Sequence, residues 1–220
     1  MLKIIEHTME VKVFINNLWQ ENTIVLYDDT NEAVVIDCGC FNQEEENKIQ
    51  KFFEEKNLKP VALLNTHLHI DHIFGNNFMK KKYGLATKAA KEDNFLIENA
   101  IKYASELGVT GITPPPAVGE FLKDGEIVRF GHSELLVIAV AGHSPGGLCY
   151  YSEKDKLLIA GDVLFAGSVG RSDLPGGDSF SLIRGIREKL LVLPDDVKVI
   201  PGHGPATTIG EEKRYNPFLS

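Results

Sequence analysis

Three histidines and an aspartate crowd into six positions of the stretch NTHLHIDHIFG, residues 65–75. His67 and His69 are two residues apart, which places both side chains on the same side of an extended segment but on nearly opposite sides of a helix. The stretch should therefore begin as a loop at the end of a strand. Asp71 and His72 then fall where the next helix begins and point in other directions, which favours two adjoining metal sites over one.

Other apolar runs of the chain also end in a residue that can bind a metal. Within one to three positions of their ends, AVVI reaches Asp37, VALLN reaches His67, LLVIAVAG reaches His143, LLIAG reaches Asp162 and VKVIPG reaches His203. If these runs are strands of shared sheets, their ends can converge on one edge. Loops at strand ends are where α/β proteins commonly build their sites.

Together these observations make seven residues available as metal ligands: His67, His69, Asp71, His72, His143, Asp162 and His203. They offer nitrogen and oxygen donors and no thiolate, which suits zinc, iron or manganese without choosing among them. We therefore expect two divalent metal ions. A capping aspartate with surface histidines could explain HLHIDH alone, but it does not explain the Gly-rich GHSPGG and PGHGP as well. His7 and His132 are predicted to be turn or surface residues.

The elements that must position these ligands are predicted to form a mixed α/β chain. In the N-terminal third, EVKVFI, NTIVLY and AVVIDCG alternate with polar turns, a pattern typical of antiparallel strands and hairpins. Apolar positions three or four residues apart predict helices over 43–56, 88–107 and 179–192. Further strands are predicted at 61–65, 126–130, 134–141, 148–152 and 157–161 and in VKVIP.

No internal repeat, low-complexity tract or linker interrupts the chain, so we predict one α/β domain over residues 1–220. The segment 88–120 contains no ligand and lies between the ligand blocks. It is predicted to form one wall of the substrate pocket, with its TPPPA loop at 113–117 extended by the prolines. Phe95, Tyr103 and Phe121 are candidate contacts there, and core packing is the alternative for each.

Composition and charge limit the classes of partner. The 220 residues are 43% apolar and 25% charged, as in ordinary globular proteins, and carry a formal net charge of -8. That charge and the lack of a long basic run argue against nucleic acid. Acidic residues interrupt the apolar start, and three cysteines form no even framework. We expect a cytoplasmic protein with a small-molecule substrate and no membrane partner, and the sequence does not indicate its oligomeric state.

The motifs resemble a known family. THLHIDH is similar to the HxHxDH signature of the metallo-β-lactamase superfamily, and GHSPGG, GDVLF and PGHGP follow in the order and contexts of that superfamily. Within it, GDVLFAGSVGRSDLPGGD and PGHGPATTIGEEKRYNPFL look most like the short type II glyoxalases, the hydroxyacylglutathione hydrolase-like proteins. The resemblance implies a four-layer αββα sandwich with the metal site between the edges of two sheets.

The resemblance also assigns the ligands to two metals: His67, His69 and His143 to the first, Asp71, His72 and His203 to the second, and Asp162 to both. It gives Asp37 the role of orienting a ligand histidine from outside the metal site, and Asp71 that of orienting the nucleophile. Authentic glyoxalases II hold glutathione with a Lys and an aromatic residue shortly after the bridging aspartate, where this chain has Arg171 and Asp173. Arg171 could pair with a substrate carboxylate, and a local bridge to Asp173 is the alternative.

These roles favour hydrolysis of a small thioester of the S-lactoylglutathione type. Two metals can lower the pKa of a shared water from about 15.7 toward about 7 and so supply hydroxide. A thiolate with a pKa of about 8.5 then leaves without a proton donor. The main alternative is a persulfide dioxygenase with one iron, followed by a lactonase with the same ligands. A zinc β-lactamase commonly has Cys at Asp162, a nuclease relative needs a basic surface, and a non-enzymatic metal module is usually closed by cysteines.

Overall fold

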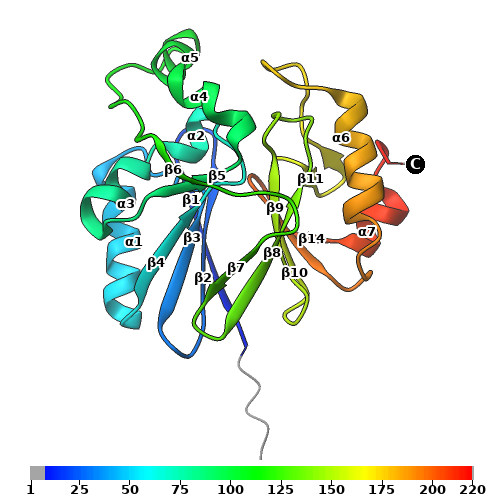
Figure 1. Ribbon diagram of the computed structural model, residues 1–220, viewed down its shortest axis with the longest axis horizontal. Coiled ribbons are helices and arrows are strands. Elements are labelled where there is room, and N and C mark those ends of the chain that lie inside the picture. The colour runs from blue at the N-terminus through cyan, green and yellow to red at the C-terminus, as the bar shows by residue number, and fades with distance from the viewer. Residues whose placement is uncertain (1–7, 220) are drawn as a thin grey trace, which may run out of the picture.

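The computed structural model describes residues 8–219 and shows two six-stranded sheets packed face to face. Helices α1 (Gln43–Lys56) and α3 (Asn76–Tyr83) cover the outer face of one sheet, and α6 (Ser179–Gly185) and α7 (Ile209–Tyr215) cover that of the other (Figure 1). The layers are therefore helix, sheet, sheet, helix, which confirms the αββα sandwich. In the described part of the chain, no helix is both long and apolar enough to cross a membrane.

The first sheet has the strand order β1-β2-β3-β4-β5-β6. Its members are β1 (Glu10–Asn16), β2 (Glu21–Tyr27), β3 (Glu32–Ile36), β4 (Lys59–Leu64), β5 (Thr87–Ala89) and β6 (Val118–Phe121). The first three strands pair antiparallel, as predicted, and the pairs from β3 to β6 are parallel. The parallel strands β3 and β4 share the edge where Asp37 and His67 follow them.

The second sheet has the order β14-β13-β10-β9-β8-β7. Its members are β7 (Ile127–Phe130), β8 (Ser133–Ala139), β9 (Leu148–Ser152), β10 (Leu157–Gly161), β13 (Lys198–Pro201) and β14 (Thr207–Thr208), with a small hairpin of β11 (Leu164–Phe165) and β12 (Ser168–Val169) beside it. Strands β10 and β13 are parallel, so Asp162 and His203 follow them at one edge.

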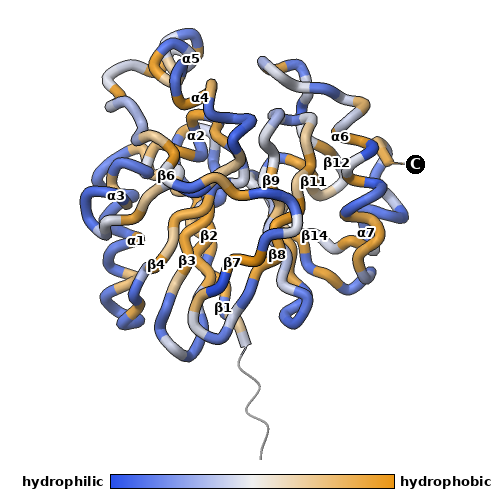
Figure 2. Tube along the Cα trace, viewed as in Figure 1, coloured by the Kyte–Doolittle hydropathy of each residue, from blue (hydrophilic) through white to orange (hydrophobic). Residues whose placement is uncertain are grey.

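The sheets are held together by apolar side chains, which give the strands their hydrophobic colour in Figure 2. The buried cluster between the sheets includes Ile24 and Ile36 from the first sheet and Leu135 and Tyr150 from the second. Burying a large apolar side chain fully contributes about 1.5–3 kcal/mol. This interface therefore fixes how the ligand-bearing edges of the two sheets face each other.

The predicted helix 43–56 is confirmed as α1. Asn42 caps it by accepting a hydrogen bond from the Glu45 backbone N–H at 3.1 Å, and the first turn is acidic, which suits the positive end of the helix dipole. Ile49 and Phe53 are buried on its inner face against the first sheet. The helix connects β3 to the parallel strand β4 and so sets where the histidine-rich loop begins.

The single helix predicted at 88–107 is wrong. Residues Thr87–Ala89 form β5, and η1 (Lys91–Asp93), α4 (Asn94–Glu98) and α5 (Ala100–Glu106) follow, with Asn99 separating the last two. The Lys88 carbonyl accepts a hydrogen bond from the Asn65 N–H at 2.8 Å, so sheet pairing overrides the helical pattern at its start. The helix predicted at 179–192 is α6 followed by a π-helical turn, η2 (Ile186–Leu190).

Candidate metal centre

The seven predicted ligands lie on loops that follow strands of both sheets. From the first sheet come His67 and His69, in the loop after β4, and Asp71 and His72, in the short helix α2 (Ile70–Ile73); from the second come His143 after β8, Asp162 after β10 and His203 after β13. All seven converge on one end of the sandwich. The remaining described histidine, His132, is exposed in the β7–β8 turn as predicted, and His7 lies outside the described residues.

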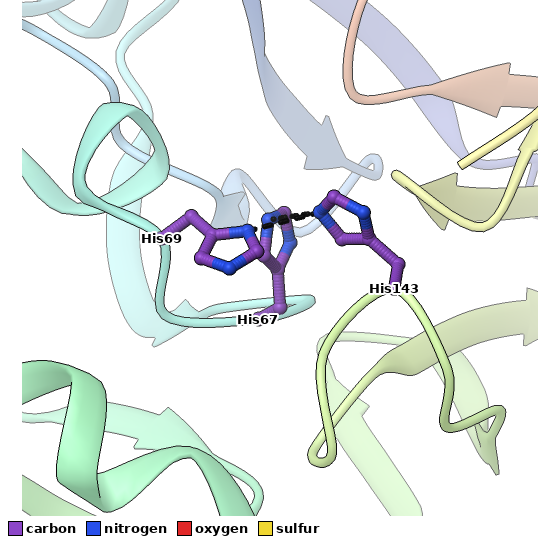
Figure 3. A group of neighbouring side chains, drawn as sticks. All are labelled: His67, His69 and His143. Atoms are coloured by element: carbon purple, nitrogen blue, oxygen red, sulfur yellow. Dashed lines mark hydrogen bonds between the residues drawn. The ribbon is translucent and has the colours of Figure 1, made fainter. Parts of the chain in front are cut away.

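His67, His69 and His143, the first group, turn ring nitrogens toward one another (Figure 3). The Nδ1 of His69 lies 2.9 Å from the Nε2 of His143, and that atom lies 3.2 Å from the Nε2 of His67. His67 and His69 come from the first sheet, whereas His143 comes from the second. Three nitrogens at these distances can surround a single cation.

The outer nitrogens of this group decide which ring atoms carry protons. The Nδ1 of His143 lies 2.8 Å from the Arg171 carbonyl and therefore donates to it. The Nδ1 of His67 lies 3.1 Å from the Thr66 hydroxyl oxygen. That hydroxyl donates its proton to Asp37 Oδ2 at 2.6 Å, so its oxygen accepts the proton of His67 Nδ1. In neutral rings both Nε2 atoms then carry lone pairs that face each other, an arrangement that a cation between them satisfies.

Asp71, His72 and His203 form the second group. The Nε2 of His203 lies 3.2 Å from Asp71 Oδ2 and 3.3 Å from the Nε2 of His72. The outer nitrogens are again held by acceptors, since the Nδ1 of His203 is 2.9 Å from the Trp19 carbonyl and the Nδ1 of His72 is 3.1 Å from Asp37 Oδ2. In neutral rings the same proton assignment follows, and both Nε2 atoms can then bind a metal.

Asp162 lies between the two groups. Its Oδ1 is 3.6 Å from the Nε2 of His72, and its Oδ2 is 3.6 Å from the Nε2 of His143 and 3.7 Å from that of His203. The Oδ1 is buried without a hydrogen-bond partner among the residues that the structure describes. A buried carboxylate oxygen with no partner is costly unless it binds a cation. The position fits the bridging role, which stays a prediction.

The two groups differ in their electrostatics. Burial and the neighbouring histidines lower the pKa of His67, and the same causes lower the pKa of His69 to about 3. Burial also acts to lower the pKa of His72, but the nearby carboxylates, Asp71 foremost, raise it well above its ordinary value. Burial acts to raise the pKa of Asp71 and of Asp162, but the neighbouring histidines together, His72 foremost, lower both. The second group therefore holds protons more firmly than the first.

Asp37 lies behind His72, where the resemblance expected it. Its backbone φ of 52° is in the left-handed region, and its buried carboxylate accepts from the Thr66 N–H at 2.7 Å and the Thr66 hydroxyl at 2.6 Å. Through Thr66 it reaches His67, and directly it reaches His72. One carboxylate therefore contacts His72 directly and His67 through Thr66, as the outer partners of metal-ligating histidines usually do, and its orienting role stays a prediction.

Sequence reasoning missed the residues that join the ligand loops of the two sheets. Asp93 is fully buried, and its carboxylate accepts from Leu68 N–H at 3.2 Å, the Ser144 hydroxyl at 2.8 Å and Gly146 N–H at 2.6 Å. It thus links the loop of His67 and His69 to the loop of His143. Its surroundings in the sequence, KEDN, gave no signal, because an acidic residue in a polar stretch is typical of a surface.

Asn22, in β2 of the first sheet, holds the loop of His203, which comes from the second sheet. Its side-chain amide donates to the Pro201 and Gly204 carbonyls, both at 3.0 Å, and its backbone N–H donates to the Gly202 carbonyl at 2.7 Å. The neighbouring Glu21 is also missed: it is fully buried, and burial raises the pKa of its carboxyl well above the usual range. In the sequence both residues belong to an ordinary strand pattern.

A cavity of about 470 Å3 opens on the metal centre, and five of the predicted ligands line it. The wall predicted from 88–120 is only partly correct, because residues 96–107 line this cavity through Tyr103 and others, whereas Phe95, Phe121 and the proline loop do not. The loop instead borders a separate hollow of about 610 Å3 through Thr113 and Pro115. Arg171 lines the cavity and also forms the local bridge to Asp173, at 2.7 and 2.8 Å.

An αββα sandwich with a group of three histidines beside a group of two histidines and an aspartate, at the edge of its sheets, has the architecture of a metal-binding protein. The family model of the metallo-beta-lactamase superfamily matches residues 16–203. The chain belongs to this superfamily, which confirms the resemblance. With hydrolases among its relatives, it is classed as a metallo-hydrolase.

Two curated relatives cover almost the whole chain. Hydroxyacylglutathione hydrolase GloC of Haemophilus influenzae is 37% identical over 213 residues, which are 96% of this chain and 99% of the relative. The probable metallo-hydrolase YqgX of Bacillus subtilis is 37% identical over 202 residues, 91% of this chain and 93% of the relative.

Two solved structures are similar in both sequence and fold. BLEG-1 B3 metallo-beta-lactamase has a TM-score of 0.88 at 34% identity, covering 96% of this chain and 100% of that one. The di-iron-bound form of TTHA1623 has a TM-score of 0.84 at 36% identity, covering 94% of this chain and 100% of that one.

Proposed function

We propose that this metallo-hydrolase cleaves a small thioester of the S-lactoylglutathione type in the cytoplasm, and that it acts on a small molecule without a nucleic-acid or membrane partner. The observation that carries the proposal is the shared position of Asp162 between two donor groups that open on one cavity. The name of the Haemophilus influenzae relative, a hydroxyacylglutathione hydrolase, supports the substrate type.

The donor set supports two divalent ions, of which zinc is the one we propose, with iron and manganese as the alternatives. The di-iron form of TTHA1623 supports a pair of ions. Bound there, two such ions supply Lewis acidity and a water of lowered pKa. The site would have His67, His69 and His143 as ligands of one ion and Asp71, His72 and His203 as ligands of the other.

The residues of the chain perform the remaining tasks. The Asp71 carboxylate, whose pKa is lowered chiefly by His72 against the effect of burial, stays ionised and would orient the attacking water. As the new C–O bond forms and the C–S bond breaks, the sulfur leaves as a thiolate with a pKa of about 8.5, so it needs no proton donor. Asp37 and Thr66 keep the ligand rings of both groups in place.

A second candidate is a persulfide dioxygenase, an oxidoreductase with one iron. The observation that favours it is the second group itself, in which two histidines and one carboxylate lie within 4.8 Å of one another, the donor set of mononuclear non-haem iron sites. A lactonase would use the same seven ligands. The reaction measured distinguishes these two activities from that of a thioesterase: a dioxygenase consumes oxygen, a lactonase opens a lactone, and a thioesterase releases a thiol.

The test loads the purified protein with zinc or iron and measures metal per chain. Thiol release from S-lactoylglutathione is compared with oxygen uptake on glutathione persulfide and with lactone opening. We expect thiol release, and its loss in Asp162→Ala together with loss of metal from both groups. Asp196→Asn, an exposed surface change, serves as the control. Two metals retained with near-normal turnover in Asp162→Ala would refute the bridging role, and oxygen uptake without thiol release would favour the second candidate.

A further inference from the structure

The cavity over the metal centre is lined by apolar side chains as well as by five of the predicted ligands. From this we infer that its preferred substrates are thioesters with a hydrocarbon acyl chain, rather than the hydroxylated lactoyl group, and that the thiol carrier is held only weakly. This inference rests on the proposed thioester hydrolysis and specifies the acyl group. At about 30 Å3 for each heavy atom, a chain of about six carbons fills less than half of the 470 Å3 cavity.

The apolar lining begins at the ligands. Leu68 lies between two ligand histidines in the sequence and is only 1% exposed, and it packs in one cluster with Leu96 and Ala100 of α4 and α5. Leu107, at the end of α5, and Leu174 also line the cavity. A hydrocarbon chain attached to the reacting carbonyl would contact apolar side chains there, and its burial is favourable.

Two aromatic residues, Trp19 and Tyr103, also line the cavity, and Trp19 is held in place by its neighbours. The Trp19 ring is stacked on Phe74, with centroids 6.0 Å apart and planes at 11°. Its carbonyl accepts the proton of His203 Nδ1 at 2.9 Å, so the backbone is held to the metal centre as well. Because the ring is already ordered, contact with an acyl chain costs little conformational entropy.

The charges of the cavity do not match glutathione, which carries two carboxylates and an ammonium group. Of the described residues that line the cavity, Arg171 is the one Lys or Arg, and the Nε–Nη2 edge of its guanidinium is already bound to Asp173. Glu106 adds a negative charge to the same lining. Asp173 offsets the charge of Arg171, so this part of the lining offers a carboxylate of the carrier little net positive charge. The peptide part of the carrier is therefore expected to stay in water.

The experiment uses the full-length, metal-loaded protein and six thioesters. Lactoyl, butyryl and hexanoyl groups are each joined to glutathione and to N-acetylcysteamine, which lacks the carboxylates. We expect kcat/KM to rise about fourfold for each buried methylene, or about 16-fold from butyryl to hexanoyl. We also expect the two carriers to differ by less than about threefold. A flat response to chain length with lactoyl preferred would overturn this inference alone, whereas no thiol release from any thioester would overturn the proposed function itself.

Variants locate the effect in the lining. Leu107→Gln changes a side chain that is 59% exposed, so the fold should tolerate it, and Leu174→Gln is a second, independent change. Each should reduce the gain per methylene to about twofold. Val192→Gln, at a residue that is 69% exposed and does not line the cavity, is the matched control and should keep the fourfold gain. An unchanged gain in both leucine variants would overturn the assignment of the acyl site.

Discussion

Asp93 binds no predicted metal, yet it joins two ligand loops that come from different sheets. Asp93→Ala would leave three buried donors, Leu68 N–H, Gly146 N–H and the Ser144 hydroxyl, without their acceptor. Each unsatisfied buried group costs about 1–3 kcal/mol. Part of that cost is offset, because the variant no longer has to desolvate a buried carboxylate. We expect the free energy of unfolding of the metal-free protein to fall by about 3 kcal/mol.

Asp93→Asn keeps the volume and one acceptor oxygen, so it separates geometry from stability. It should cost only about 1–2 kcal/mol of stability, because one or two of the three hydrogen bonds are lost. Metal affinity of the first group should fall about 10–100-fold, as when other outer partners of metal ligands are changed. The second group, which Asp93 does not contact, should keep its affinity.

The assays are chemical unfolding of the metal-free protein and zinc titration against a competing chelator. Asp28→Asn is the matched control, because Asp28 is also buried and also accepts several hydrogen bonds, from Thr30, His132 and Ser133, in the β7–β8 turn region away from the metal centre. It should cost similar stability and leave both zinc affinities unchanged. Wild-type zinc affinity at both sites in Asp93→Asn would refute the view that this carboxylate sets the ligand geometry.

Three further outcomes follow from the same geometry. Carboxylates raise the pKa of His72 and His203 despite burial, so these two rings take up protons first as the pH falls. Dialysis below about pH 6 should therefore release the metal of the second group before that of the first. Loss in the opposite order would contradict this. Gly202→Ala should reduce metal per chain at both groups, since a Cβ there would lie 2.3 Å from Asp162 Oδ1 and 2.7 Å from His72 Cε1. Gly204→Ala is the control: its Cβ would have no atom within 4 Å, so the change should cost only the backbone strain of a φ of 74°. Removing the metal with a chelator should lower the melting temperature, because a bound metal at about 100 times its Kd stabilises the native state by about 2.7 kcal/mol. An unchanged melting temperature would show that the metal does not bind the native state.

The convergence of the candidate ligands could be predicted from the sequence because His67, Asp162 and His203 closely follow apolar runs, and these runs are strands with parallel partners that end at one edge. Asp93 and Asn22 could not be predicted in the same way. Their partners are 25 to 53 residues away for Asp93 and 179 to 182 for Asn22, across the two sheets, and no local pattern marks a polar side chain whose partners come from another sheet. The failure at 88–107 has a related cause: three residues of β5 are too few to give an alternating pattern.

The division of the ligands between the sheets makes metal binding a property of the packed molecule. Neither sheet supplies a complete group, since the first group needs His143 and the second needs His203, both from the second sheet. The outer partners cross over as well, with the Trp19 carbonyl of the first sheet holding His203. A change in how the sheets pack would therefore move donors of both groups at once. Substitutions in the cluster between the sheets, far from any ligand, should lower metal affinity together with stability, whereas substitutions under the outer helices should lower stability alone.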